Sequence, residues 1–190
     1  MSALLRFSRF VDALNTRIGH LVYWAILAAV VVSAGNAIIR KALDISSNAW
    51  LELQWYLFSL VFLFGAGYTL LRNEHVKIDI IYGRLPRRAQ IWIEILGTLF
   101  FLLPASAIIM ALSWPVFLLS YHSNEWSPNA GGLPLWPARL MVPIGFLLLI
   151  LQGLSEVIKR IAYLTGHLDE SAVTVDREPE IDTSIIQVKE

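Results

Sequence analysis

The chain has 190 residues, of which 56% are hydrophobic and only 16% are charged, and its formal net charge at pH 7 is zero. A soluble domain usually carries about 25% charged residues, so this deficit indicates a chain that is partly surrounded by lipid. The absence of cysteine excludes disulfides, thiolate catalysis and cysteine-ligated metal centres, and no basic run is long enough to suggest nucleic-acid binding.

The first 18 residues predict an amphipathic helix that lies on the membrane surface. Apolar side chains recur with a 3-4-3-4 spacing, which is typical of one helical face: Leu4, Phe7, Val11, Leu14 and Ile18. Arg6, Arg9 and Asp12 lie off this stripe. The pattern favours an interfacial helix over the alternative, an extension of the first membrane helix.

Four stretches are long and apolar enough to cross a membrane, which requires about 20 mostly apolar residues. Three of them, near 19–40, 48–71 and 93–119, coincide with runs of 22, 19 and 30 residues that lack Asp, Glu, Lys and Arg. The fourth, near 136–157, reaches full length if the Arg139 side chain extends to the membrane surface. Pro104 and Pro115 predict kinks in the third stretch, whose freed carbonyls need protein neighbours.

The first stretch has a competing interpretation as a cleaved signal peptide, because residues 32–34 loosely resemble a cleavage site. The apolar run continues beyond them to Arg40, which favours a retained helix. The predicted fold class is an all-α integral membrane protein with four transmembrane helices and an N-terminal interfacial helix. Its predicted parts are the amphipathic helix 1–18, the four-helix domain 19–167 and an acidic, disordered tail 168–190.

The positive charges predict the orientation. With both termini inside, 12 of the 15 Lys and Arg residues lie on the inner side and 3 on the outer side. Cytoplasmic loops carry an excess of Lys and Arg, so we expect both termini and the 72–92 segment to be cytoplasmic.

The histidines do not predict a cofactor site. A haem b site needs two histidines at matching depth on facing helices. His20, His75, His122 and His167 fall near different helix ends or in connections. We therefore expect no cofactor, no metal ion and no catalytic residue.

The ionisable side chains in the predicted helices all lie near a helix end: Glu52, Glu94, Arg139 and Glu156. A proton-coupled carrier normally needs a carboxylate at the membrane midplane. Glu52 has two interpretations, since it either pairs with Arg40 or Lys41 or faces a partner subunit. Small residues at every fourth position from Ala25 to Ala37, and in 65–67, predict close helix packing within the chain or against a partner.

One set of residues resembles a family signature. The second helix holds Glu52, Phe58, Phe62, Gly65 and Tyr68, and the Arg72-x-x-His75-Val76-x-Ile78-Asp79 sequence follows it. Joined to four spans and this loop order, the pattern resembles the small permease subunits, of DctQ type, of tripartite ATP-independent periplasmic (TRAP) transporters. The resemblance covers about residues 10–165 and leaves out the acidic tail.

The resemblance implies an accessory subunit of the bacterial inner membrane that acts as a scaffold in the lipid bilayer. Its partners would be a large permease subunit, which carries the substrate and sodium sites, and a periplasmic receptor that delivers an organic acid. The candidate interface or structural residues are Glu52, Arg72, His75 and Asp79 of the signature, with Tyr56, which continues the face of Glu52 at helical spacing. Two alternatives remain open, a small exporter that acts as an oligomer and a membrane-embedded redox enzyme subunit.

Overall fold

The chain folds into a bundle of long helices, which a computed structural model describes for residues 2–44, 47–72 and 85–168. Four stretches are long and apolar enough to cross a membrane: α1 (Ser2–Leu43), α2 (Asn48–Leu71), the segment Arg87–His122, and α6 (Trp136–Leu164). The third consists of α4 (Arg87–Gly97), a π-helical turn η1 (Thr98–Leu102) and α5 (Leu103–His122). The prediction of an all-α protein with four long apolar helices is confirmed. His75, Asp79 and the tail beyond residue 168 lie outside the described residues.

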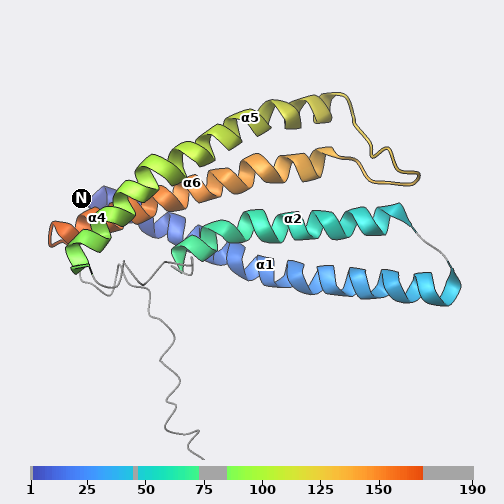
Figure 1. Cartoon of the computed structure of the whole chain (residues 1–190), viewed down its shortest axis with the longest axis horizontal. Helices are drawn as coiled ribbons and strands as arrows, with labels where there is room; N and C mark the ends of the chain where they lie inside the picture. Colours follow the sequence, from blue (N-terminus) through green and yellow to red (C-terminus); the bar gives the residue numbers. More distant parts are fainter. Residues whose placement is uncertain (1, 45–46, 73–84, 169–190) are drawn as a thin grey trace, which may run out of the picture.

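Helix α6 lies at the centre of the bundle. Helices α1, α2 and α5 all pack against it, and α1 also packs along α2 (Figure 1). The chain's N-terminus, α4 and the C-terminal end of α6 lie together at one end, here called the N-terminal end. The opposite end, here called the loop end, holds the α1–α2 and α5–α6 connections. This arrangement leaves α5 packed mainly on α6, with much of its apolar surface exposed.

Small residues allow close helix approach within the chain, at glycines other than those that the sequence singled out. A Cβ at Gly145 of α6 would lie 2.7 Å from the Leu63 Cβ of α2, so only glycine permits this approach. At the α1–α2 contact, a Cβ at Gly19 would lie 2.5 Å from the ring of Tyr68. Close packing therefore occurs within the chain at both crossings.

The predicted small-residue stripe of α1 is used in part. Ala25 and Ala29 are buried, whereas Ser33 is half-buried and Ala37 is exposed. The first half of the stripe therefore packs within the chain, whereas the second half is less buried.

The third span remains helical through Pro104 and Pro115, the two prolines at which the sequence predicts kinks. Pro104 stands at the start of α5, directly after the π-helical turn η1. Proline has no N–H to donate to the preceding turn, and a π-helical turn is one way in which a helix accommodates the lost bond. Pro115 lies inside α5, which continues to His122.

The N-terminal residues do not form the separate interfacial helix that the sequence predicts. Residues 2–43 are one continuous helix. Its buried face in this region holds Ser8, Val11, Asn15 and Gly19, so only Val11 of the apolar stripe is buried. The prediction counted apolar side chains alone, whereas the face that packs on α6 is largely polar and is fixed by hydrogen bonds across the contact.

Candidate functional site: polar networks at the two ends of the bundle

Glu52 anchors the α5–α6 connection at the loop end. Its carboxylate accepts hydrogen bonds from the Ser127 hydroxyl, from Asn129 Nδ2 at 3.0 Å and from the Leu133 backbone N–H at 2.6 Å. The three donors come from one loop more than 70 residues away in the chain. Glu52 therefore binds within the chain, to this loop and not to Arg40 or Lys41.

The connection itself, residues 123–135, is shaped to meet that carboxylate. Ser127 N–H donates to the Leu133 carbonyl at 3.0 Å, which folds the loop back on itself. A Cβ at Gly132 would lie 2.5 Å from the Ser127 Cβ and 2.8 Å from a Glu52 oxygen, so the turn requires glycine. The hydroxyl of Tyr56, one turn along α2, donates to the Pro134 carbonyl at 2.7 Å. The structure thus brings Glu52 and Tyr56 together, as two supports of one loop.

Arg139 and Glu125 close the base of the same loop. Arg139 Nη1 lies 2.5 Å from Glu125 Oε2, and both side chains are about one third exposed. Leu135 N–H also donates to the Glu125 carbonyl at 2.9 Å. Arg139 thereby has a partner at the membrane boundary, where an unpaired charge would be costly.

The N-terminal end holds a larger network, in which Arg160 joins two helices. Arg160 of α6 pairs with Glu94 of α4 at 2.7 Å and with Glu156 at 2.6 Å. Its side chain is 5% exposed, and that of Glu156 is 6% exposed. Lys159 extends the network to α1, since its Nζ lies 2.5 Å from Glu156 and 3.1 Å from Asp12. Buried charges need such pairing, so these contacts fix α1 and α4 on α6.

Neutral polar groups continue this network toward the membrane. Gln152 accepts from Asn15 at 2.9 Å and donates to Asp12 at 2.9 Å and to Glu156 at 3.1 Å. The hydroxyls of Ser8 and Ser155 lie 2.6 Å apart. Asn15, Gln152 and the two serines are at most 1% exposed, so α1 and α6 share a buried polar seam. Helices in lipid are commonly joined by such side-chain hydrogen bonds.

Arg72 lies apart from both networks, at the end of α2. Its Nε donates to the Tyr68 hydroxyl at 3.0 Å, and its guanidinium carbon lies 5.3 Å from the centre of the Tyr68 ring. The Tyr68 ring in turn packs on Gly19. Arg72 is therefore oriented by α2 itself at the point where the 73–84 segment begins.

Sequence reasoning missed most of the N-terminal network. It singled out Glu94 and Glu156 but assigned them no partner, and it treated Asp12 only as a residue off the apolar stripe. The available signal was Gln152 inside an otherwise apolar run, together with Asn15 seven residues after Ser8. Polar residues at helical spacing within a span indicate a packed face rather than a lipid face.

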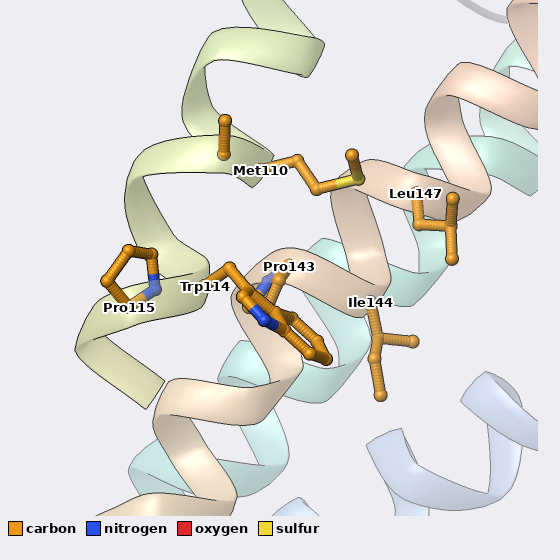
Figure 2. A pocket seen from close by; sticks show the side chains of 7 residues that line it. Met110, Trp114, Pro115, Pro143, Ile144 and Leu147 are labelled. Carbon is orange, nitrogen blue, oxygen red and sulfur yellow. The ribbon is translucent and has the colours of Figure 1, made fainter. Parts of the chain in front are cut away.

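An apolar cavity lies beside the contact between α5 and α6, and none of the residues that line it is charged. A cavity of about 380 Å³ lies between α5 and α6, lined by Met110, Ala111, Trp114, Pro115, Pro143, Ile144 and Leu147. Met110 and Trp114 extend from α5 toward α6 across it (Figure 2). A site for a carboxylate substrate needs convergent polar groups, and this lining supplies none. Within the described residues, no group of three or more His, Cys, Asp or Glu could hold a metal ion.

Fold and networks define a four-helix membrane protein whose polar groups fasten its own helices together. A comparison with known protein families matches residues 29–162 to the DctQ component of tripartite ATP-independent periplasmic transporters. The match covers more than half of the chain, so the chain belongs to this family of small TRAP transporter membrane subunits. The family is not enzymatic, and its tripartite organisation implies a large permease and a periplasmic binding partner. Searches of curated proteins and of solved structures found no match.

Proposed function

We propose that this chain is the rigid, non-transporting scaffold subunit of a transporter that imports an organic acid with a sodium gradient. Family membership supports the tripartite assembly. The position of the charges supports the division of labour, because the charged side chains of the four spans lie near their ends. A secondary transporter builds its substrate and ion sites near the midplane, so those sites belong to the large subunit.

The observation that carries this proposal is the buried ion network at the N-terminal end. Arg160, Glu156, Lys159 and Asp12 connect α1 to α6, and Glu94 adds α4. Separating these helices would leave charges unpaired in a site with little water, which is strongly unfavourable. Alternating access requires one group of helices to move against another. The buried ion pairs oppose such motion of α1 and α4 against α6, which supports a role as a rigid scaffold.

The sequence-derived candidates take the following proposed roles. Glu52 and Tyr56 hold the 123–135 loop in one shape at the loop end, where we place the contact with the periplasmic receptor or the large subunit. We assign Arg72, His75 and Asp79 to the cytoplasmic side with both termini, on the sequence argument that Lys and Arg are in excess there. The bacterial inner membrane is the proposed location.

Reconstitution tests the proposal. The chain alone in vesicles should show no sodium-driven uptake of organic acids, whereas the chain with its large permease and receptor should show it. Sodium-driven uptake by the chain alone would contradict the scaffold role. Uptake by the permease and receptor that is equally fast without this chain would contradict the need for it.

A matched pair of variants tests the loop's role in the complex. Glu52→Gln keeps the shape of the side chain but removes the charge that three donors share, so co-purification with the partners or uptake should fall. Glu125→Gln removes one carboxylate from the same loop region, where the partner is a single partly exposed arginine. Equal effects of the two substitutions would argue against a specific role of Glu52.

A further inference from the structure

The first half of α1 separates its charges by face. Asp12 is the only acidic residue between Ser2 and Leu43, and it turns toward α6, where Lys159 Nζ lies 3.1 Å away. Arg6, Arg9 and Arg17 are all exposed. Within the part of the chain that the structure describes, none of these three guanidinium groups forms an ion pair with a carboxylate. The outward side of the helix therefore carries uncompensated positive charge.

Aromatic side chains share this outward side. Arg6, Phe10, Ala13, Arg17 and Trp24 follow a 4-3-4-7 spacing, which places them along one line of a helix. Phe10 is 66% exposed and Trp24 is 72% exposed. The buried residues Ser8, Val11 and Asn15 occupy the opposite side. We call the exposed set Arg6, Arg9, Phe10, Arg17 and Trp24 the arginine face.

The length of α1 places this face at a membrane boundary. A helix of 42 residues is about 63 Å long, roughly twice the thickness of the hydrocarbon core of a bilayer. The 22 uncharged residues between Arg17 and Arg40 span about 33 Å, which matches that core. Arg17 thus lies at the boundary, with Trp24 inside it. Residues 2–16 extend beyond it, along the end of α6 that holds Gln152 and Lys159.

We propose that the arginine face binds the headgroups of anionic phospholipids in the leaflet at the N-terminal end. Guanidinium groups match phosphate oxygens in geometry and charge. A second copy of the same face is a poor occupant, because its arginines would meet like charges. The choice of the cytoplasmic leaflet rests on the topology proposed above, whereas the lipid contact itself does not.

The absence of cysteine makes a local test direct. Ala13 is exposed between Phe10 and Arg17 on the same side of the helix as the arginine face, so Ala13→Cys provides a single site for a spin label. The labelled full chain is reconstituted in phosphatidylcholine vesicles with and without an equal part of phosphatidylglycerol. Collision rates with oxygen, which enriches in lipid, and with a water-soluble nickel complex report the depth of the label. Phosphatidylglycerol bound to the arginine face should shield the label from the nickel complex, and high salt should reverse this shielding because it screens the charges.

Variants separate the arginines from general effects of charge. Each arginine near a membrane surface contributes about fivefold to the preference for anionic lipid, so Arg6→Gln with Arg9→Gln and Arg17→Gln should abolish the phosphatidylglycerol response. Arg40→Gln with Lys41→Gln removes exposed cations from the other end of the same helix and should leave the response intact. Circular dichroism and thermal unfolding confirm that each variant is folded.

Three results would overturn the proposal. The first is that phosphatidylglycerol does not change the exposure of the label in the chain that carries only Ala13→Cys. This result is independent of the arginine variants. The second is a response that survives in the folded triple variant. The third is a label that becomes shielded in pure phosphatidylcholine only when the large permease is added, because the arginine face would then be a protein interface.

Discussion

Replacing Arg160 by methionine tests whether the buried network holds the bundle together. The substitution keeps much of the side-chain volume but removes the charge that Glu94 and Glu156 share. Glu156 keeps Lys159 as a partner, whereas Glu94 loses the guanidinium of α6. Removing one member of a buried pair typically costs about 3–5 kcal/mol, and the remaining lysine favours the lower end of this range.

Arg139→Met is the matched control. It removes the same side chain from a pair with a glutamate, at 2.5 Å, where both groups are about one third exposed. An exposed pair contributes at most about 1 kcal/mol, so this variant should unfold close to the unmodified chain. Thermal unfolding in lipid nanodiscs, followed by tryptophan fluorescence, measures both. At about 2–4 °C for each kcal/mol, Arg160→Met should lower the midpoint by roughly 6–12 °C.

The comparison has a clear refuting result. If Arg160→Met lowers the midpoint no more than Arg139→Met, the buried network does not stabilise the bundle, and the argument for a rigid scaffold fails. Combining Arg160→Met with Glu94→Gln refines the test. The double variant should be less destabilised than the sum of the single variants, because the second substitution neutralises the carboxylate that lost its Arg160 partner in the first.

Three further predictions concern the loop, the helix contacts and the topology. Glu52→Ala should speed hydrogen exchange at the Leu133 amide, which donates to the Glu52 carboxylate, with no change in global unfolding. Gly145→Ala should destabilise by about 1–3 kcal/mol, because its Cβ would overlap α2, whereas Gly35→Ala, with open space around it, should not. Alkaline phosphatase fused after Ser127 should be active, and a fusion after the end of α6 should be inactive. Activity of the second fusion would reject the cytoplasmic C-terminus.

The four spans were predictable because lipid imposes a simple requirement. A helix in hydrocarbon satisfies its own backbone and must present a long run of apolar side chains, and both features are local in the sequence. The second span, 48–71, was predicted with the bounds that the structure gives to α2. The third was predicted as 93–119, whereas its helix begins at Arg87, because charged residues outside the hydrocarbon core remain helical.

The partners of the polar residues were not predictable in the same way. The Asn15–Gln152 hydrogen bond joins residues 137 positions apart, and the Ser8–Ser155 bond joins residues 147 apart. Hydrophobic periodicity reports which face of a helix is apolar, but not which polar group on another helix it meets. The same limit explains why the sequence offered only two interpretations of Glu52, a pair with Arg40 or Lys41, the nearest cations in sequence, or a contact with a partner subunit. The structure offered the 123–135 loop instead.

The two polar networks lie at opposite ends of the helix bundle. At the N-terminal end, charged pairs join α1, α4 and α6, and at the loop end Glu52 joins α2 to the connection between α5 and α6. The helix pairs α1–α6 and α4–α6, and α2 with the α5–α6 connection, are thereby fastened near the two ends, while the cavity between α5 and α6 beside Trp114 is lined by uncharged side chains. A protein that carried a solute would need the reverse, with polar groups in the middle and weak contacts at the ends. The proposed division of labour in the TRAP complex follows from this contrast, because helices fastened at their ends around an uncharged middle suit a fixed support and not a carrier of solutes.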